Sequence, residues 1–313
     1  MTMRVAAAML GALLLSGCVT YPDISQSRSP CRFEPGGWCG FVREAALEAW
    51  PYAVAATNAY VGDSDTFADD GPLLEPIARL DIAPEDAKKG FDYQLFAQFE
   101  PGSANTEGRK PIARILAFRG TDFDGLTDIF YGTLRSDQIE IAMRYFDAER
   151  ARLGNDVPWI VTGHSLGGAL ATEISVKYPE VRAYMFNTSP FYEGDAMTND
   201  VQRMVFNERG EVLRRFARFD ADPAADVYTV NCGPQKNTLA KHKVRPLADC
   251  IAWIAAYGST DALAVVKANK VPKPMVECGP EDKPHPGVQT RQKVPCVHVA
   301  REEKKSEKPR KGN

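Results

Sequence analysis

The feature that most constrains the fold of this chain is the stretch 159–171, WIVTGHSLGGALA. An apolar, β-branched run comes first, a Gly-x-Ser-x-Gly turn follows, and small, helix-favouring residues complete it. A buried strand that turns sharply at one serine and then enters a helix has this order, and it presents the serine hydroxyl at the end of a sheet. The stretch therefore predicts an α/β arrangement built around Ser165, with Ser165 as a candidate nucleophile.

The glycines of this stretch have a mechanical explanation. A serine in so sharp a turn has a strained backbone, so Gly163 and Gly167 leave room where a Cβ would meet the neighbouring strand or helix. Gly168 and Ala169 let the helix pack close to the sheet. The N-terminus of that helix brings its dipole and free N–H groups near Ser165, where negative charge develops during acyl transfer. The alternative is an ordinary Gly/Ser turn without chemistry, which the flanking strand and helix patterns disfavour.

The whole chain suits one large domain with short extensions, since it has 313 residues, of which 44% are hydrophobic and 25% charged. Two small domains are the alternative. The formal net charge of −3 and the pI near 5.9 give no basic footprint, which argues against a nucleic-acid partner. Strand-like and helix-like segments alternate, which predicts an α/β fold with a mostly parallel sheet and helices on both faces.

Hydrophobic periodicity places these segments along the chain. Besides the run before Ser165, the strand candidates cover 93–99, 112–118, 181–186, 201–206 and 227–230. The helix candidates cover 41–50, ending before Pro51, and then 135–152, 169–178 and 246–257. Residues 62–90 are polar with Gly, Asp and Pro, and they predict loops with short helical turns.

The N-terminus has the pattern of an export signal. Arg4 gives a positive start, residues 5–15 are apolar, and the letters LSGC end at Cys18. The apolar run is too short to span a bilayer. Its ending resembles a bacterial lipobox, in which Cys18 would become the lipidated first residue of the mature protein. The next residue is Val19 and not Asp, which by the same resemblance would favour the outer membrane over the inner one. The alternatives are an ordinary secretory signal and a buried N-terminal helix.

Composition divides the chain into four parts. A lipoprotein signal peptide covers 1–17, and a tether rich in Pro, Ser and Gly covers 18–40. The α/β domain covers 41–258. Residues 259–313 form a Pro- and charge-rich C-terminal extension, which is expected to be partly disordered.

Cysteine usage agrees with export. Beyond Cys18 the chain has six cysteines, and none has the Cys-x-x-Cys spacing that would support a zinc site. In an oxidising compartment an even number favours disulfides. We expect pairing of sequence neighbours, with buried free thiols and the other connectivities left open. The expected pairs are Cys31–Cys39, Cys232–Cys250 and Cys278–Cys296.

Two motifs together carry a family resemblance: ILAFRGT at 115–121 and VTGHSLGGALA at 161–171. They resemble the fungal-type (class 3) lipases of the α/β-hydrolase fold. In that family an AFRGT-like strand end supplies an oxyanion-hole residue, a long helix follows, and a TGHSLGGALA elbow comes next. The resemblance is specific over 112–172 and loose elsewhere.

The resemblance implies that Ser165 is the nucleophile. The backbone N–H of Leu166 would be one oxyanion donor, and Thr121 would supply the second. Residues 122–133 occupy the place of the family's lid, and their apolar side chains would suit an acyl chain or a lipid interface. A packed loop is the equal alternative for this segment.

Four histidines are candidates for the general base. His164 lies beside the nucleophile on the same turn, so it cannot easily reach Ser165 Oγ, and it matches the family's structural elbow histidine. His242 precedes the last predicted helix, in the loop where the family places its base, and is the first choice. His298 comes next; like His285, it lies in the poorly patterned C-terminal segment.

The carboxylate that orients the histidine should lie between the serine and the histidine in the chain. The family places it after the strand that follows 181–186, commonly as a Gly-Asp pair, and this chain has Gly210-Glu211 there. The resemblance therefore nominates Glu211, a departure from the usual Asp. The rivals that stay open are Asp195, Asp220, Asp222 and Asp226.

The expected function is a serine carboxylic-ester hydrolase at the cell envelope: a lipase, esterase or phospholipase with a Ser-His-acid triad. No metal or organic cofactor is implied. The expected partners are an ester or lipid substrate and, through Cys18, a membrane, while the oligomeric state is not set by the sequence. The alternative is a non-catalytic binding or structural lipoprotein on a hydrolase scaffold; a serine peptidase or acyltransferase would share the triad.

Overall fold

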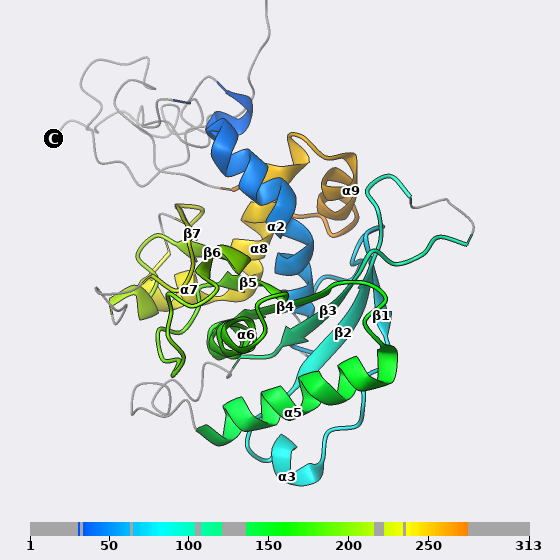
Figure 1. The fold of residues 1–313 in the computed structure, drawn as a ribbon. Coiled ribbons are helices and arrows are strands. Elements are labelled where there is room, and N and C mark those ends of the chain that lie inside the picture. The colour runs from blue at the N-terminus through cyan, green and yellow to red at the C-terminus, as the bar shows by residue number, and fades with distance from the viewer. Residues whose placement is uncertain are drawn as a thin grey trace, which may run out of the picture.

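The computed structural model describes residues 31, 34–62, 65–103, 108–120, 136–215, 222–233 and 236–274. Within these residues one seven-stranded sheet has the order β1-β2-β3-β4-β5-β6-β7 (Figure 1). β1 and β2 run antiparallel to their neighbours, and β3 to β7 are parallel to one another. The strands are β1 (Leu74–Ile77), β2 (Tyr93–Gln98), β3 (Ala113–Phe118), β4 (Trp159–His164), β5 (Arg182–Phe186), β6 (Arg203–Glu208) and β7 (Asp226–Val230).

Helices cover both faces of the sheet (Figure 1). One face carries α2 (Gly40–Asn58) and α8 (Val244–Ala256), with α9 (Thr260–Ala268) packed on α8. The other face carries α5 (Ser136–Leu153) and α6 (Leu166–Lys177). The connections hold α3 (Pro84–Ala87), α7 (Thr238–His242) and the 3-10 turns η1 (Pro35–Gly37), η3 (Asp200–Gln202) and η4 (Leu213–Arg215).

The central strands are buried on both faces, as parallel strands between two helix layers must be. Successive side chains of β3 point to opposite sides of the sheet. Ile115 and Ala117 belong to the buried cluster shared with α2 and α8, whereas Leu116 and Phe118 belong to the cluster shared with α5 and α6. The predicted α/β class, with a mostly parallel sheet and helices on both faces, is confirmed.

Helix α2 is longer than predicted. The sequence prediction ends it before Pro51, but the helix continues to Asn58 with Pro51 in its interior. Proline in a helix interior costs about 3 kcal/mol. Its neighbours Trp50, Tyr52 and Ala53 are buried, and burying one large apolar side chain contributes about 1.5–3 kcal/mol. Tertiary packing therefore outweighs the local helix-breaking tendency.

Strand β1 lies within 62–90, a segment predicted to be loops. It has four residues, LEPI, of which Leu74 is buried and Glu75 and Pro76 are exposed. Within the described residues β1 pairs with β2 alone, so it is an edge strand, where a proline that lacks an N–H is tolerated. A strand this short, with a proline and no regular alternation, leaves no periodic signal in the sequence.

The packed body extends past both limits that the sequence analysis gives to the α/β domain, 41–258. Trp38, before the first limit, and Val266, after the second, belong to the same buried cluster. Ser259 caps α9 by accepting a hydrogen bond from the backbone N–H of Ala262. The short helix after Gly258 is thus part of the core, because its apolar side chains pack on α8.

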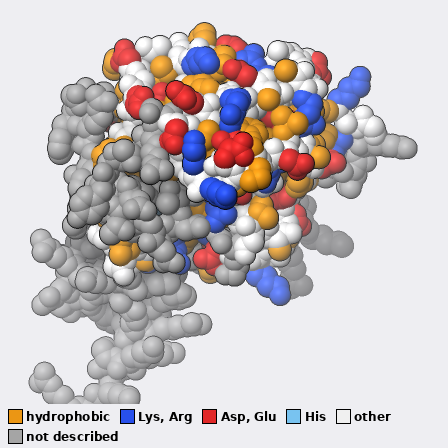
Figure 2. Space-filling view, turned by 90° about the horizontal axis from the view of Figure 1, so that it is seen from below, with side chains coloured by type: hydrophobic (Ala, Val, Ile, Leu, Met, Phe, Trp, Pro, Cys, Tyr) orange, Lys and Arg blue, Asp and Glu red, His pale blue; other side chains and the backbone are white. Residues whose placement is uncertain are grey.

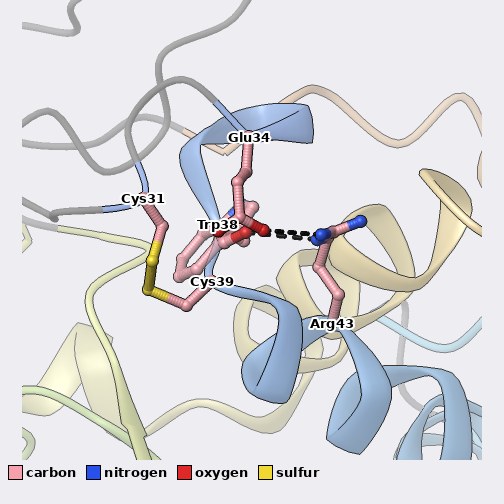
Figure 3. The surroundings of a disulfide bond; sticks show 5 residues. All are labelled: Cys31, Glu34, Trp38, Cys39 and Arg43. Carbon is pink, nitrogen blue, oxygen red and sulfur yellow. Dashed lines mark hydrogen bonds and ion pairs between the residues drawn. A yellow bond between two sulfur atoms is a disulfide. The ribbon is translucent and has the colours of Figure 1, made fainter.

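The first disulfide closes the segment that leads into α2. Cys31 and Cys39 are bonded, and beside them Glu34 forms an ion pair with Arg43 at 2.7 Å (Figure 3). Arg43 Nε also donates to the carbonyl of Trp38 at 3.1 Å. Part of the predicted tether is therefore folded onto the N-terminal end of α2.

The second disulfide joins Cys232, after β7, to Cys250 in α8. Both pairs are among those expected from the sequence, and they fit an oxidising compartment. The third expected pair, Cys278–Cys296, lies outside the described residues, as do the signal segment with Cys18 and the lid candidate 122–133.

The exposed surface seen from the side of α3 and α5 mixes positive and negative side chains, with hydrophobic ones between them (Figure 2).

Among the helices of the described residues, none combines the length and apolar character that a membrane span needs.

Candidate active site

Ser165 sits in the turn between β4 and α6 with a positive φ of 56° and a ψ of −122°, a combination that L-residues rarely adopt. Neighbouring backbone holds this turn from both sides. The Ser165 N–H donates to the carbonyl of Phe186 at 3.2 Å, and its carbonyl accepts from the N–H groups of Gly168 and Ser189, both at 3.0 Å. A non-glycine residue in this region is strained and persists where its surroundings fix it, which is common at functional sites.

The strand and the helix meet too closely at this turn for side chains on Gly163 and Gly167. A Cβ on Gly163 would lie 2.3 Å from the backbone of Gly167, and a Cβ on Gly167 would lie 2.3 Å from the carbonyl oxygen of Phe118. Backbone atoms cannot rotate away as side chains do. The steric role predicted for both glycines is confirmed.

His242 and Glu211 lie beside Ser165 although they are far away in the sequence. Ser165 follows β4, Glu211 follows β6, and His242 ends the short helix that follows β7. Because parallel strands end at the same edge of a sheet, these connections meet there. His242 Nε2 lies 3.0 Å from Ser165 Oγ, and His242 Nδ1 lies 2.7 Å from Glu211 Oε2. All three residues are buried.

Glu211 is held by backbone as well as by the histidine. It follows Gly210, whose φ of 76° turns the chain after β6. Glu211 Oε2 accepts from the N–H of Leu213 at 2.8 Å, and Oε1 accepts from the N–H of Arg214 at 2.6 Å. A carboxylate only accepts, so His242 Nδ1 donates to it and leaves Nε2 to accept from the Ser165 hydroxyl. This arrangement can activate a serine for nucleophilic attack.

The rival carboxylates are placed differently. Asp195, Asp222 and Asp226 are all exposed. Asp195 accepts hydrogen bonds from Met197 and Thr198 within its own turn. The remaining rivals, Asp220 for the acid and His298 for the base, lie outside the described residues, as does His285.

One of the two predicted oxyanion donors can be located. Leu166 is the first residue of α6, so its N–H belongs to the first helical turn, where N–H groups have no acceptor within the helix and the helix dipole favours negative charge. Thr121 lies outside the described residues. Gly120, just before it, runs beside the nucleophile, because a Cβ there would lie 3.3 Å from Ser165 Cβ.

His164 has a structural place beneath the site. Its Nε2 donates to the carbonyl of His242 at 2.6 Å, and its Nδ1 accepts from the hydroxyl of Tyr60 at 2.8 Å. Burial lowers the pKa of His164 well below its usual range, and the nearby His242 lowers this pKa further. Both hydrogen bonds suit a neutral ring. Tyr60 was not nominated from the sequence, since it is 104 residues from His164 and belongs to no recognisable motif.

Asn187 is a second residue that sequence reasoning missed. It follows β5 with φ 44° and is fully buried. Its Nδ2 lies 3.1 Å from the carbonyl oxygens of both Lys241 and His242. In the sequence it is one of several turn residues after a strand, so only its positive φ and its long-range contacts distinguish it.

Another buried carboxylate holds the chain just after β7. Glu208, at the end of β6, accepts from the N–H groups of Cys232 and Gly233, both at 2.9 Å. Burial raises the pKa of the Glu208 carboxyl. Cys232 is also tied to α8 by its disulfide with Cys250. Cys232 and Gly233 are thus held by the disulfide and by hydrogen bonds just after β7.

Among the described residues, the His, Cys, Asp and Glu side chains form no group of three or more that could hold a metal ion.

Comparisons with known proteins found similarity in structure only. No protein-family model and no curated protein matches the chain. Among solved structures, the nonglycosylated LIP2 lipase of Yarrowia lipolytica is 13% identical, with 60% of this chain and 80% of that chain covered and a TM-score of 0.43. A lipase from Rhizopus microsporus var. chinensis is 18% identical, with 57% and 76% covered and a TM-score of 0.37. The Rhizomucor miehei lipase propeptide complex is 13% identical, with 65% and 77% covered and a TM-score of 0.39.

Proposed function

We propose that this protein is a serine carboxylic-ester hydrolase of the lipase or esterase type, with Ser165 as nucleophile, His242 as base and Glu211 as the orienting acid. The observation that carries the proposal is the buried chain of hydrogen bonds from Glu211 through His242 to Ser165 Oγ, with contacts of 2.7 and 3.0 Å. The strained turn at Ser165 and the N-terminus of α6 next to it support the same conclusion.

The reaction begins when His242 Nε2 takes the hydroxyl proton of Ser165 and Oγ attacks the ester carbonyl carbon. The oxygen of that carbonyl becomes an oxyanion, which the N–H of Leu166 stabilises, with Thr121 as the second donor. His242 returns the proton to the leaving alcohol as the carbon–oxygen bond breaks. Water, deprotonated by His242, then releases the acid from Ser165, while Glu211 stabilises the imidazolium in both steps.

The test is hydrolysis of p-nitrophenyl esters by a pair of serine variants. Ser165→Ala removes the nucleophile, whereas Ser175→Ala removes a buried hydroxyl on α6 that has no hydrogen-bond partner among the described residues. We expect Ser165→Ala to be folded and to lose all activity above background, and Ser175→Ala to retain the wild-type rate. Activity in folded Ser165→Ala would refute the assignment.

A fluorophosphonate probe separates an enzyme from a binding protein on the same scaffold, because only an activated serine displaces its fluoride. We expect labelling of the wild type and none of Ser165→Ala. A panel of esters that differ in acyl length and head group then distinguishes lipase, esterase and phospholipase activity.

We also propose that the enzyme is attached to the cell envelope through a lipid on Cys18. The apolar run that ends in LSGC and the use of disulfides support this location. Metabolic labelling with palmitate should mark the wild type and leave Cys18→Ser unlabelled. A wild type that carries no lipid would refute the anchor and leave the hydrolase proposal intact.

A further inference from the structure

The imidazole of His242 can face Ser165 only if the main chain that carries it is fixed. His242 ends α7, a helix of five residues in which His242 alone is buried. Its carbonyl oxygen accepts two buried hydrogen bonds, from His164 Nε2 at 2.6 Å and from Asn187 Nδ2 at 3.1 Å. These bonds hold the peptide unit directly attached to the base.

Asn187 links this peptide to the sheet. Its backbone N–H donates to the carbonyl of Phe206 at 2.9 Å, and its Oδ1 accepts from the N–H of Glu208 at 2.8 Å. Its Nδ2 reaches the carbonyl oxygens of Lys241 and His242. One side-chain amide thus joins the ends of β5 and β6 to the segment that presents the base.

The backbone conformation alone does not explain this residue. A φ of 44° is tolerated by asparagine but is adopted more readily by glycine. What glycine would lack is the amide group, whose donors and acceptor are all used in a fully buried place. Removing it takes one donor from the carbonyls of Lys241 and His242 and the side-chain acceptor from the buried Glu208 N–H, and a buried polar group that loses a partner is destabilised.

We propose that Asn187 is a positioning residue that places the His242 imidazole against Ser165 by holding the main chain of residues 241 and 242. The inference rests on the proposed function, because the placement of His242 matters for activity only if His242 is the base. Asn187 touches neither Ser165 Oγ nor the His242 ring nitrogens through any hydrogen bond of the described residues; it acts through the backbone.

The chain offers a matched control for the test. Asn199 also has a left-handed backbone, with φ 57°, and its Nδ2 also donates to two consecutive carbonyls, those of Ser175 and Val176, at 3.2 and 3.0 Å. These carbonyls belong to the C-terminal end of α6, away from Ser165 at its N-terminal end. Asn187→Gly and Asn199→Gly therefore remove the same kind of bonds and relieve the same kind of strain.

We expect Asn187→Gly to lower kcat on a p-nitrophenyl ester by roughly 10- to 100-fold with KM little changed, since a small displacement of a catalytic group has effects of this size. Asn199→Gly should stay within about twofold of the wild type, because it loses comparable bonds far from the reacting atoms. Asn187→Asp retains an acceptor for the Glu208 N–H but places a carboxyl oxygen against the carbonyls of Lys241 and His242, so it should lose at least as much kcat as Asn187→Gly. If both folded Asn187 variants kept a kcat within twofold of Asn199→Gly, the inference would be wrong.

A spectroscopic readout keeps the test independent of activity and of the folding of one variant. The Nδ1 proton of His242, in its buried bond to Glu211, should give a downfield proton resonance that disappears in His242→Gln. We expect this resonance to shift or broaden in Asn187→Gly, which adds no charge, and to be unchanged in Asn199→Gly. An unchanged resonance in Asn187→Gly would contradict the inference. Activity in Ser165→Ala would instead refute the proposed function itself, so the two failures are distinguishable.

Discussion

Replacing Glu211 by glutamine removes the charge next to His242 while keeping the shape of the side chain. In the wild type Oε2 accepts from His242 Nδ1 and from the Leu213 N–H, and Oε1 accepts from the Arg214 N–H. A glutamine that places its oxygen at the Oε2 position keeps two of these bonds and turns its NH₂ group toward the N–H of Arg214. The histidine tautomer is then retained, but the imidazolium loses its counter-charge.

The magnitude follows from the geometry. Opposite unit charges about 4 Å apart attract by about 4 kcal/mol at an effective dielectric constant of about 20. This attraction exists only while His242 is protonated, which is during the transition state, so its loss should lower kcat by about 10³-fold. The glutamine NH₂ group would face the N–H of Arg214, and this pair of donors without an acceptor should reduce the free energy of unfolding by about 1–3 kcal/mol.

Glu208→Gln is the matched control. Glu208 is also buried and also accepts two backbone N–H groups, but those belong to Cys232 and Gly233 and not to the base. We expect the free energy of unfolding, measured with urea, to fall by a similar amount. The kcat on p-nitrophenyl esters should stay within about threefold of the wild type, because no reacting group loses a contact. The reasoning fails if folded Glu211→Gln keeps more than about a tenth of the wild-type kcat, or if Glu208→Gln loses as much.

Three further predictions concern stability, each measured by urea unfolding. Gly163→Ala should lose at least the roughly 1–3 kcal/mol of unfolding free energy typical of overpacking, because the new Cβ would lie 2.3 Å from helix backbone. Gly40→Ala is the control and should be neutral, because its Cβ would lie 3.9 Å from the side chains of Glu34 and Arg43. Equal stability of the two variants would contradict this prediction. Because the pKa of His164 is lowered in the folded protein, the unfolded chain takes up a proton below about pH 6.5 that the folded protein does not. The free energy of unfolding should therefore fall by up to about 1.4 kcal/mol per pH unit below that pH. His164→Gln should not show this contribution. Replacing Cys232 by Ser together with Cys250 by Ala should reduce the free energy of unfolding by about 3 kcal/mol, because the disulfide closes a loop of 18 residues. An unchanged midpoint of urea unfolding would rule this out.

The parts of the fold that follow from sequence are those with a local physical signal. The apolar strand before Ser165, the glycines that permit the close turn and the periodic helix 135–152 each reflect packing within a short stretch, and the structure has them as β4, the elbow and α5. The parallel sheet follows from the alternation of such segments. Pro51 and β1 show the limit, because both depend on what packs against them from distant parts of the chain.

The candidate site divides in the same way. Ser165 carries a motif, and His242 and Glu211 were nominated by resemblance and chain order; the structure brings all three together, while their catalytic roles stay predictions. Tyr60 and Asn187 have no motif, since their importance lies in partners 104 and 55 residues away. Contacts of this kind become visible only once the ends of neighbouring strands are placed at one edge.

A glutamate at 211, where the resemblance leads one to expect aspartate, need not weaken the site, because the placement of the base is set mainly by backbone. The main chain of Lys241 and His242 is held by the amide of Asn187, and the His242 carbonyl also accepts from the ring of His164. With the main chain of His242 fixed independently, the acid needs only to reach Nδ1, and the longer side chain of Glu211 does so while two N–H groups of its own turn hold it. The buried polar groups around this site therefore stabilise one placement of the imidazole, and substitutions that loosen that main chain should impair turnover even where every member of the triad is retained.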